Sequence, residues 1–301
     1  MRFRHRPRPG GPHTAPGPPA NIGTAARRAS GPRAFRLVRC VAIAAAALLP
    51  PAAPDAAAAP PGGEDRLLVG FIEDGALINQ AWIEFAGTLR DAEDGRDLGL
   101  GVRAAFRYGR DAEAGFDLAV LNRERDEGAL LYGSPVPDRF EHTGAADPVV
   151  YGKYRLVRGA CDLALGARAS LPLAPHDSGL TSGAWEGRGF VAFRGAWRQA
   201  AFVGHLGLGV SGDAQYEDGA EGGTFSTGSI GAVVAVARLW NLLAEFNFEG
   251  ARFRGEEERG RGLVGLDWQP TRNLRVRGGI GSGWGGESGT ISGIAAFVFN
   301  L

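Results

Sequence analysis

Segments in which apolar and polar side chains alternate recur from about residue 80 to the end of the chain. In one of them, Leu98, Leu100 and Phe106 fall on one face, whereas Arg103 and Arg107 fall on the other. Because successive side chains of a β-strand point to opposite faces, this period of two predicts strands with one apolar and one polar face. We count about twelve segments of roughly 9 to 13 residues, the length that a tilted strand needs to cross a bilayer. They fall near residues 80–90, 97–108, 114–123, 148–157, 161–172, 184–194, 200–211, 228–238, 241–252, 262–269, 273–283 and 290–300.

The composition agrees with a β-rich chain. It includes 48 glycines and a single Met in 301 residues, and glycine disfavours a helix interior by about 1 kcal/mol relative to alanine. After the N-terminal region no long apolar run is present, which excludes a helical membrane protein. The formal net charge is zero, so overall charge does not attract nucleic acid, and no nucleic-acid partner is expected.

The connections between these segments alternate in length. Short turns are expected at 109–113, 158–160, 195–199, 239–240 and 270–272. Longer connections rich in Gly, Asp, Glu and Ser are expected at 91–96, 124–147, 173–183, 212–227, 253–261 and 284–289. Outer-membrane barrels pair short periplasmic turns with longer external loops, and an even strand count places both termini on the periplasmic side.

These patterns predict an all-β fold, a transmembrane antiparallel up-and-down β-barrel of about twelve strands. A soluble β-sandwich also alternates, but its outer face would be polar. The positions of the aromatic residues favour the barrel, because they stand near segment ends, where barrels carry aromatic girdles. These residues are Trp185, Trp197, Trp240, Trp268, Trp284, Tyr108 and Tyr154.

The N-terminal region indicates export. Residues 1–37 are a basic, Pro- and Gly-rich arm expected to be disordered, and 38–59 hold an apolar run and an alanine tract typical of a signal peptide. Cleavage near Ala59 would leave residues 60–301 as the barrel domain, located in the bacterial outer membrane. A gene start placed too far upstream is the alternative explanation of the long arm.

Cysteine and the last segment add two expectations. After cleavage Cys161 is the only thiol, so no disulfide forms, and we expect it to be a small buried side chain. Cys40 follows Arg39, where a lipidation site needs a small residue, which argues against a lipid anchor. Residues 291–299 alternate up to Phe299 and resemble the C-terminal insertion signal that the outer-membrane assembly machinery binds, although Asn300 and Leu301 follow.

Two further segments resemble a known family. Residues 147–156 read DPVVYGKYRL, and residues 165–172 read LGARASLP, with a glycine and a basic residue before a proline. Both are similar to strands of the outer-membrane family of phenol-degradation meta-pathway (MetA-pathway) proteins, and the layout is similar over about residues 66–301. The motif Leu173-Ala174-Pro175 departs from the Thr-Gly-Asp type of sequence that often follows in that family. The resemblance implies an outer-membrane protein that passes small solutes, aromatic or hydrophobic compounds among them.

If the apolar faces meet outer-membrane lipid, the opposite faces line a lumen of mixed charge. The candidate lumen-lining residues are Arg103, Arg107, Lys153, Arg155, Arg168, Glu186, Arg188, His205, Glu245, Glu249, Asp267, Arg275 and Arg277, with Glu84, Asp117, Arg123 and Arg194 on the same faces. One interpretation places Arg275 and Arg277 opposite Glu245, Glu249 and Asp267 at a constriction that sets selectivity. The other is structural ion pairing, which any such barrel requires. A barrel of this size admits either a narrow pore or a packed plug.

Three functions remain open from the sequence. The first is a channel or transporter-like pore for small solutes, with no cofactor, no metal site and no catalytic residues. The second is an acyl hydrolase or transferase, which needs a lipid-facing His beside a Ser; alternation places His205 inward, and His142 and His176 are expected in loops. The third is a non-conducting anchor or binding surface, with loop 124–147 as the binding element or as a lid over the mouth.

Overall fold

The structure is a computed structural model that describes residues 66–69, 73–175, 178–216, 219–286 and 289–301. The predicted arm at 1–37 and the signal region at 38–59 lie outside the described residues. Among the residues that are described, no helix is long and apolar enough to cross a membrane.

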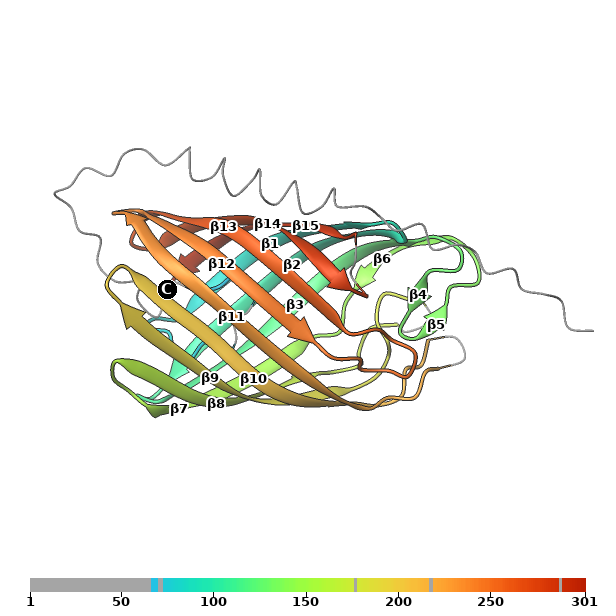
Figure 1. The fold of residues 1–301 in the computed structure, drawn as a ribbon, viewed down its shortest axis with the longest axis horizontal. Helices are drawn as coiled ribbons and strands as arrows, with labels where there is room; N and C mark the ends of the chain where they lie inside the picture. Colours follow the sequence, from blue (N-terminus) through green and yellow to red (C-terminus); the bar gives the residue numbers. More distant parts are fainter. Residues whose placement is uncertain (1–65, 70–72, 176–177, 217–218, 287–288) are drawn as a thin grey trace, which may run out of the picture. The chain divides into compact units, whose positions relative to one another are not determined.

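Fifteen strands form in the described residues (Figure 1). The first seven are β1 (Trp82–Ala92), β2 (Gly95–Tyr108), β3 (Ala112–Arg125), β4 (Leu130–Leu131), β5 (Ser134–Pro135), β6 (Phe140–Ala145) and β7 (Val149–Val157). The others are β8 (Cys161–Ser170), β9 (Glu186–Trp197), β10 (Ala200–Ser211), β11 (Thr224–Ala237), β12 (Trp240–Glu249), β13 (Arg259–Thr271), β14 (Leu274–Gly285) and β15 (Ile291–Asn300).

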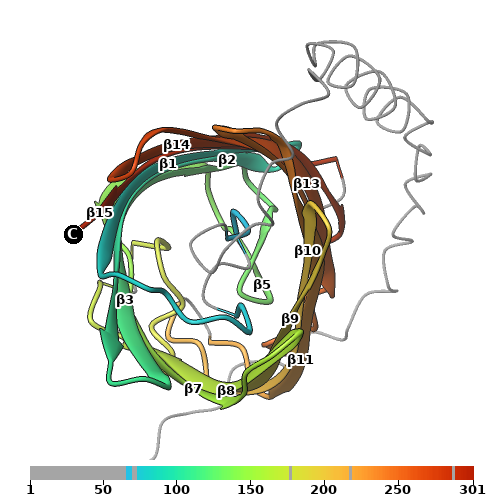
Figure 2. The same ribbon diagram turned by 90° about the vertical axis from the view of Figure 1, so that its left-hand side faces the viewer.

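Thirteen of these strands form one antiparallel sheet that closes on itself, since β1 pairs with β2 on one side and with β15 on the other. β6 and β7 both pair with β3, one after the other along its length, so they share a single place in the wall. The wall therefore has twelve strand positions, and Figure 2 shows it as a closed ring. The predicted all-β, up-and-down antiparallel barrel is confirmed, as is its strand number.

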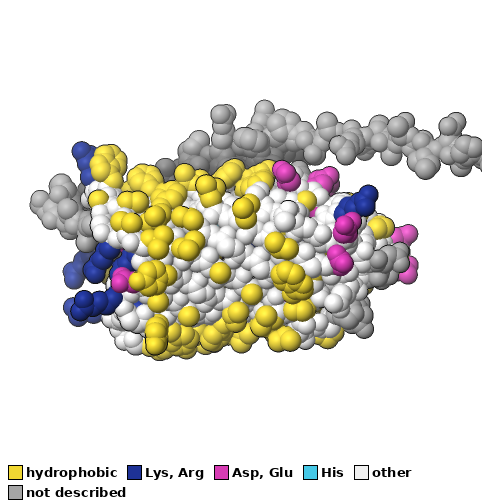
Figure 3. Space-filling view, turned by 90° about the horizontal axis from the view of Figure 1, so that it is seen from below, with side chains coloured by type: hydrophobic (Ala, Val, Ile, Leu, Met, Phe, Trp, Pro, Cys, Tyr) yellow, Lys and Arg dark blue, Asp and Glu magenta, His cyan; other side chains and the backbone are white. Residues whose placement is uncertain are grey.

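Alternation along the strands separates an apolar exterior from a polar lumen. In β10, Leu206 and Leu208 are 76% and 74% exposed, whereas Val203 and His205 are buried inside. Figure 3 shows hydrophobic side chains spread along the wall, with basic side chains at one end and mostly acidic ones at the other. An exterior of this kind would be unfavourable in water and is matched to lipid.

The two ends of the barrel differ in their connections. At the short-turn end, turns of two or three residues join β2 to β3, β7 to β8, β9 to β10, β11 to β12 and β13 to β14. Each of these turns carries an exposed arginine, namely Arg110, Arg158, Arg198, Arg238 and Arg272. The opposite end, here called the loop end, carries the longer connections and most of the exposed carboxylates.

One predicted loop is wrong. Residues 91–96 do not form a longer connection, because β1 runs to Ala92 and β2 begins at Gly95, which has a φ of 145°. The charged residues there are paired across the hairpin: Arg90 lies 3.3 Å from Asp97, and Arg96 lies 3.4 Å from Asp91. Cross-strand ion pairs stabilise a sheet, so charged residues at these positions are compatible with strands and do not indicate a loop.

Two smaller expectations are also wrong. Cys161 is exposed rather than buried, because it opens β8 on the outward face that Leu165 shares. His142 lies in strand β6 and not in a loop, because the connection after β3 returns to pair with the C-terminal half of β3. His176 lies outside the described residues.

The long connection after β3 forms a lid hairpin, made of β4 and β5, as one of the sequence hypotheses proposed. Its turn residues Tyr132 and Gly133 both have positive φ, 52° and 84°, the geometry of a tight two-residue hairpin turn. Leu131 and Val136 are buried in a cluster with Tyr216. Figure 2 shows the hairpin within the outline of the wall, so it covers the mouth at the loop end.

The turn of the lid hairpin gives a direct prediction. A Cβ at Gly133 would lie 2.4 Å from the backbone oxygen of Arg254, so Gly133→Ala adds a clash to the strain of a positive φ. We expect the hairpin to detach, which would accelerate amide exchange at Gly128 and Val136, the residues whose backbones are bonded at its base. Gly109→Ala is the control, because Gly109 in the turn between β2 and β3 also has a positive φ, but a Cβ there would have nothing within 4 Å. Equal exchange in the two variants would contradict this prediction.

Candidate functional site

A stretch of chain before the first strand lies inside the barrel. Residues 66–69 and 73–78, which we name the lumenal segment, are drawn in cyan within the ring in Figure 2. Arg66, Leu67 and Ile78 are no more than 1% exposed, although they belong to no strand. The barrel wall therefore encloses a second layer of chain, and the lumen is filled near its middle by that chain.

Apolar contacts hold the first part of the lumenal segment. Leu67 and Leu68 pack in one buried cluster with side chains of β10, β11, β12 and β15. Two inward-facing wall glycines leave room for them. A Cβ at Gly231 would lie 2.7 Å from Leu67 Cδ2, and one at Gly279 would lie 2.4 Å from Leu68 Cδ1. The same positions also approach the backbone oxygens of neighbouring strands, so the glycines serve both the wall and the segment.

Glu113 on β3 is the main polar anchor of the lumenal segment. Its carboxylate accepts hydrogen bonds from Arg66 Nη2 at 3.0 Å and from the backbone N–H of Ile78 at 2.9 Å. It also accepts the Tyr151 hydroxyl at 3.1 Å and lies 3.3 Å from Lys153 Nζ. The side chains of Glu113 and Lys153 are fully buried, so each charge depends on the others for compensation.

Basic wall residues bind the rest of the lumenal segment. Arg194 on β9 lies 2.6 Å from an oxygen of Asp74, and Lys153 donates to the backbone oxygens of Asp74 and Ala76 at 2.9 and 3.0 Å. Arg277 on β14 donates to the backbone oxygens of Arg66 and Leu67.

Glu245 on β12 accepts the backbone N–H groups of Leu68 and Val69 at 2.9 and 3.0 Å. Wall side chains thus bond several backbone groups of the segment, which has no ladder partners, and Asp74 within the segment accepts the backbone N–H of Ala76.

Between the lumenal segment and the loop end lies a cavity of about 820 Å³. Val69 and Glu73 of the segment border it on one side, and Leu131 and Tyr132 of the lid hairpin border it on the other. Its wall carries many charges, including Arg168, Arg188, His205 and Glu249. The volume is that of a site for a small molecule.

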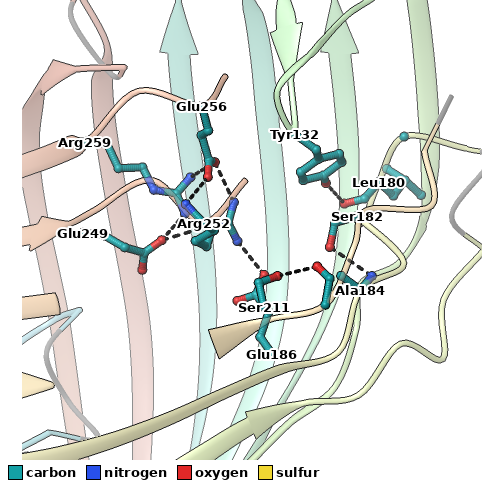
Figure 4. A network of polar contacts seen from close by, with 12 residues as sticks. Tyr132, Leu180, Ser182, Ala184, Glu186, Ser211, Glu249, Arg252, Glu256 and Arg259 are labelled. Atoms are coloured by element: carbon teal, nitrogen blue, oxygen red, sulfur yellow. Dashed lines mark hydrogen bonds and ion pairs between the residues drawn. The ribbon is translucent and has the colours of Figure 1, made fainter. Parts of the chain in front are cut away.

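An ion-pair network surrounds the cavity at the loop end (Figure 4). Arg252 lies 2.9 Å from Glu186, 3.4 Å from Glu249 and 3.0 Å from Glu256, and Arg259 contacts Glu249. Burial by itself would raise the pKa of Glu256, but the charges of Arg252 and Arg259 lower it below its ordinary value. The Glu256 carboxylate therefore stays ionised at neutral pH, and the network ties the loop 250–258 to β9 and β12.

The lid hairpin is fixed to the same end by polar contacts. Tyr132 donates its hydroxyl to the backbone oxygen of Leu180 at 3.0 Å, as Figure 4 shows. Arg123 on β3 donates to the Tyr132 hydroxyl and to the backbone oxygens of Gly179 and Leu180. Two loops and one strand thus meet at a single tyrosine.

The structure places the sequence-predicted residues in three groups. Those that contact the lumenal segment are Arg103, Lys153, Arg168, Arg188, Glu245 and Arg277. Those in the network at the loop end are Glu186 and Glu249. Those paired within the wall near the short-turn end are Arg107, Arg155, Asp267 and Arg275. His205 lines the cavity and is bonded to Ser229.

The predicted constriction of Arg275 and Arg277 opposite Glu245, Glu249 and Asp267 is not formed as one cluster. Arg275 pairs with Asp267 at 2.5 Å, next to the turn that joins their strands. Arg277 contacts Glu84 and the lumenal segment, and Glu249 belongs to the network at the loop end. The strands are long and tilted, so residues on one polar face spread over the full height of the lumen.

His205 is inward-facing and 5% exposed. Its Nδ1 lies 2.7 Å from Ser229 Oγ, and its ring meets the edge of Phe190. The pair therefore faces the lumen, where an acyl chain in the lipid layer has no access. Among the described residues, no group of three or more His, Cys, Asp or Glu side chains is arranged to hold a metal ion.

Sequence reasoning missed Arg66, Glu73, Asp74 and Glu113. The first three lie in a stretch without alternation, before the first strand, and Glu113 was expected in a turn although it lies in β3. One signal was present: two adjacent leucines and two adjacent carboxylates stand in that stretch, which is more apolar and more charged than a simple linker.

Comparison with known proteins shows the fold. No family model matches the chain, and no curated protein matches it. The crystal structure of an outer membrane channel from Pseudomonas putida is similar with a TM-score of 0.60 and 11% identity, covering 78% of this chain and 100% of that one. The NanC porin is similar with a TM-score of 0.50 and 8% identity, covering 73% of this chain and 100% of that one. At such low identity the likeness concerns the fold alone, that of outer-membrane β-barrels.

Proposed function

We propose that this protein is an outer-membrane channel for small solutes, closed at rest by its lumenal segment. The observation that carries the proposal is that the lumen is filled by a separate stretch of chain together with the wall side chains that bind it, and not by wall side chains alone. A barrel filled by its wall has no second state, whereas one filled by a segment opens when the segment leaves. The contacts of the segment are hydrogen bonds, ion pairs and two apolar clusters, all of which are reversible.

The dimensions support this function. Barrels of eight strands are filled by their own side chains, whereas those of 16 to 18 strands hold water-filled pores. A wall of twelve positions falls between them, and here it leaves room for the lumenal segment together with a cavity of about 820 Å³. Removal of the segment would join that cavity to the short-turn end.

The cellular setting follows from the same proposal. The apolar exterior would contact outer-membrane lipid, and the short-turn end with its exposed arginines would face the periplasm. Cleavage near Ala59 would release the mature chain, and β15 with Phe299 would present the insertion signal to the assembly machinery. The resemblance to the phenol-degradation family and the printed names of the similar structures, a channel and a porin, agree with solute passage.

The two alternative functions predict other results. An acyl hydrolase needs a His and Ser pair that reaches lipid, whereas His205 and Ser229 face the lumen. A purified chain that hydrolyses acyl esters, and loses this activity in Ser229→Ala, would support the enzyme. A structural anchor would show neither hydrolysis nor conductance.

The test is single-channel recording of the refolded mature chain in planar bilayers. We expect long closed periods with brief steps for the natural sequence. We expect more frequent steps with altered ion selectivity for Arg277→Ala, because Arg277 holds two backbone oxygens of the lumenal segment. Arg275→Ala is the matched control, since Arg275 pairs with Asp267 inside the wall. Folded, heat-modifiable barrels that never conduct in any variant would refute the channel.

A further inference from the structure

Two arginines stand directly opposite each other on neighbouring strands at the cavity. Arg168 on β8 and Arg188 on β9 are a cross-strand pair, and both side chains line the cavity of about 820 Å³. Like charges placed opposite each other destabilise a sheet unless an anion lies between them. The wall itself provides only part of that compensation, since Glu249 lies 2.8 Å from Arg188.

The remaining anion comes from the lumenal segment. Glu73 Oε1 lies 3.3 Å from Arg168 and 3.7 Å from Arg188, and the Glu73 side chain is 4% exposed. Glu73 is not part of the wall, so it brings its carboxylate to the two arginines only while the lumenal segment is seated. In this arrangement a side chain of the protein occupies the position of a bound carboxylate.

Further polar atoms in the lining of the same cavity have no hydrogen-bond partner among the described residues. They are Nε of Arg188, Nε2 of His205, Oγ1 of Thr227 and Nδ2 of Asn247, and all four residues line the cavity. His205 and Thr227 are 5% and 4% exposed. Buried polar atoms without partners are unfavourable, and four of them in the cavity that also contains the arginine pair indicate a site shaped for an acceptor-rich ligand.

We propose that Arg168, Arg188 and His205 form a binding site for small carboxylic acids, that Glu73 occupies this site in the closed state, and that a carboxylate solute displaces it. This rests on the proposed channel function and names its substrate class. The exchange replaces one carboxylate by another, so both arginines stay compensated throughout. A neutral solute would leave a buried arginine pair without its anion, which is strongly unfavourable. The site therefore selects anions and couples their arrival to release of the lumenal segment.

Binding is measured by calorimetry on the mature chain in detergent, with butyrate as the probe and butyramide as its neutral analogue. We expect butyrate to bind and butyramide not to bind. Glu73→Gln removes the competing charge, so butyrate should bind about tenfold more tightly, since one charge-assisted hydrogen bond is lost by the competitor. Arg168→Gln should abolish binding. Arg254→Gln is the matched control, because Arg254 is exposed in a loop and should leave binding unchanged.

Equal binding of butyrate and butyramide, or unchanged butyrate binding in Arg168→Gln, would overturn the site. Conductance recorded on the same samples separates this proposal from the channel itself. Butyrate binding in a chain that never conducts would uphold the site and refute the channel. Conducting steps with no carboxylate binding would uphold the channel and refute the site.

Discussion

Glu113→Gln is expected to open the channel more than any other single substitution in the lumen. The change keeps the shape of the side chain but removes the negative charge that Arg66 and Lys153 share. Breaking a buried ion pair by removing one partner costs about 3–5 kcal/mol. When the lumenal segment leaves, Arg66 is hydrated again. The substitution therefore destabilises mainly the closed state, in which the segment lies inside the lumen. The equilibrium should then shift toward release by about a hundredfold, measured as open probability in planar bilayers.

Glu124→Gln is the matched control on the same strand. Glu124 pairs with the exposed Arg139 at the loop end, and surface pairs contribute about 1 kcal/mol or less. Its open probability should equal that of the natural sequence. If Glu113→Gln folds normally and remains as closed as Glu124→Gln, then Glu113 does not hold the segment in place.

The second large effect is expected from the buried apolar cluster that contains Leu67 and Leu68. Leu67→Ala together with Leu68→Ala removes two buried side chains, each worth about 2–5 kcal/mol in a packed site. The wall should stay folded, because both leucines lie outside the ladder of strands. The variant should conduct for most of the recording time, and its lumenal segment should become accessible to added protease.

Leu206→Ala with Leu208→Ala gives the same loss of apolar atoms on the outer face of β10, where both side chains are exposed. This control should have the same open probability as the natural sequence. Protease resistance of the segment in Leu67→Ala with Leu68→Ala, equal to that in the control, would contradict the anchoring role of the cluster.

The wall of the barrel was predictable because its rules are local. Leu206 and Leu208 face outward and His205 inward for the same reason that every second residue of a strand does, and the segments at 200–211 and 274–280 show this without any structure. Errors came where charged residues occur in strands as well as in loops. Asp91 and Arg96 resemble loop residues in composition, yet they pair across a hairpin.

The candidate site was predictable only in part, because it depends on contacts across the lumen. Alternation places Arg168 and Arg188 on inward faces, but it does not state the register that sets them opposite each other. Nor does it indicate that Glu73, about a hundred residues earlier in the chain, lies between them. The lumenal segment has no periodicity of its own, since its backbone is satisfied by wall side chains rather than by a ladder.

A reversible tether tests most directly whether the lumenal segment closes the lumen. Leu67 of the segment and Val233 of β11 pack in the same buried cluster, so cysteines at these two positions can be joined by a short cross-linker that contains a disulfide. We would introduce Leu67→Cys and Val233→Cys with Cys161→Ser into the Glu113→Gln chain, attach the cross-linker, and record single channels before and after adding a reductant. We expect a silent barrel when oxidised and frequent conducting steps when reduced. Equal conductance in both states would show that something other than this segment sets the barrier.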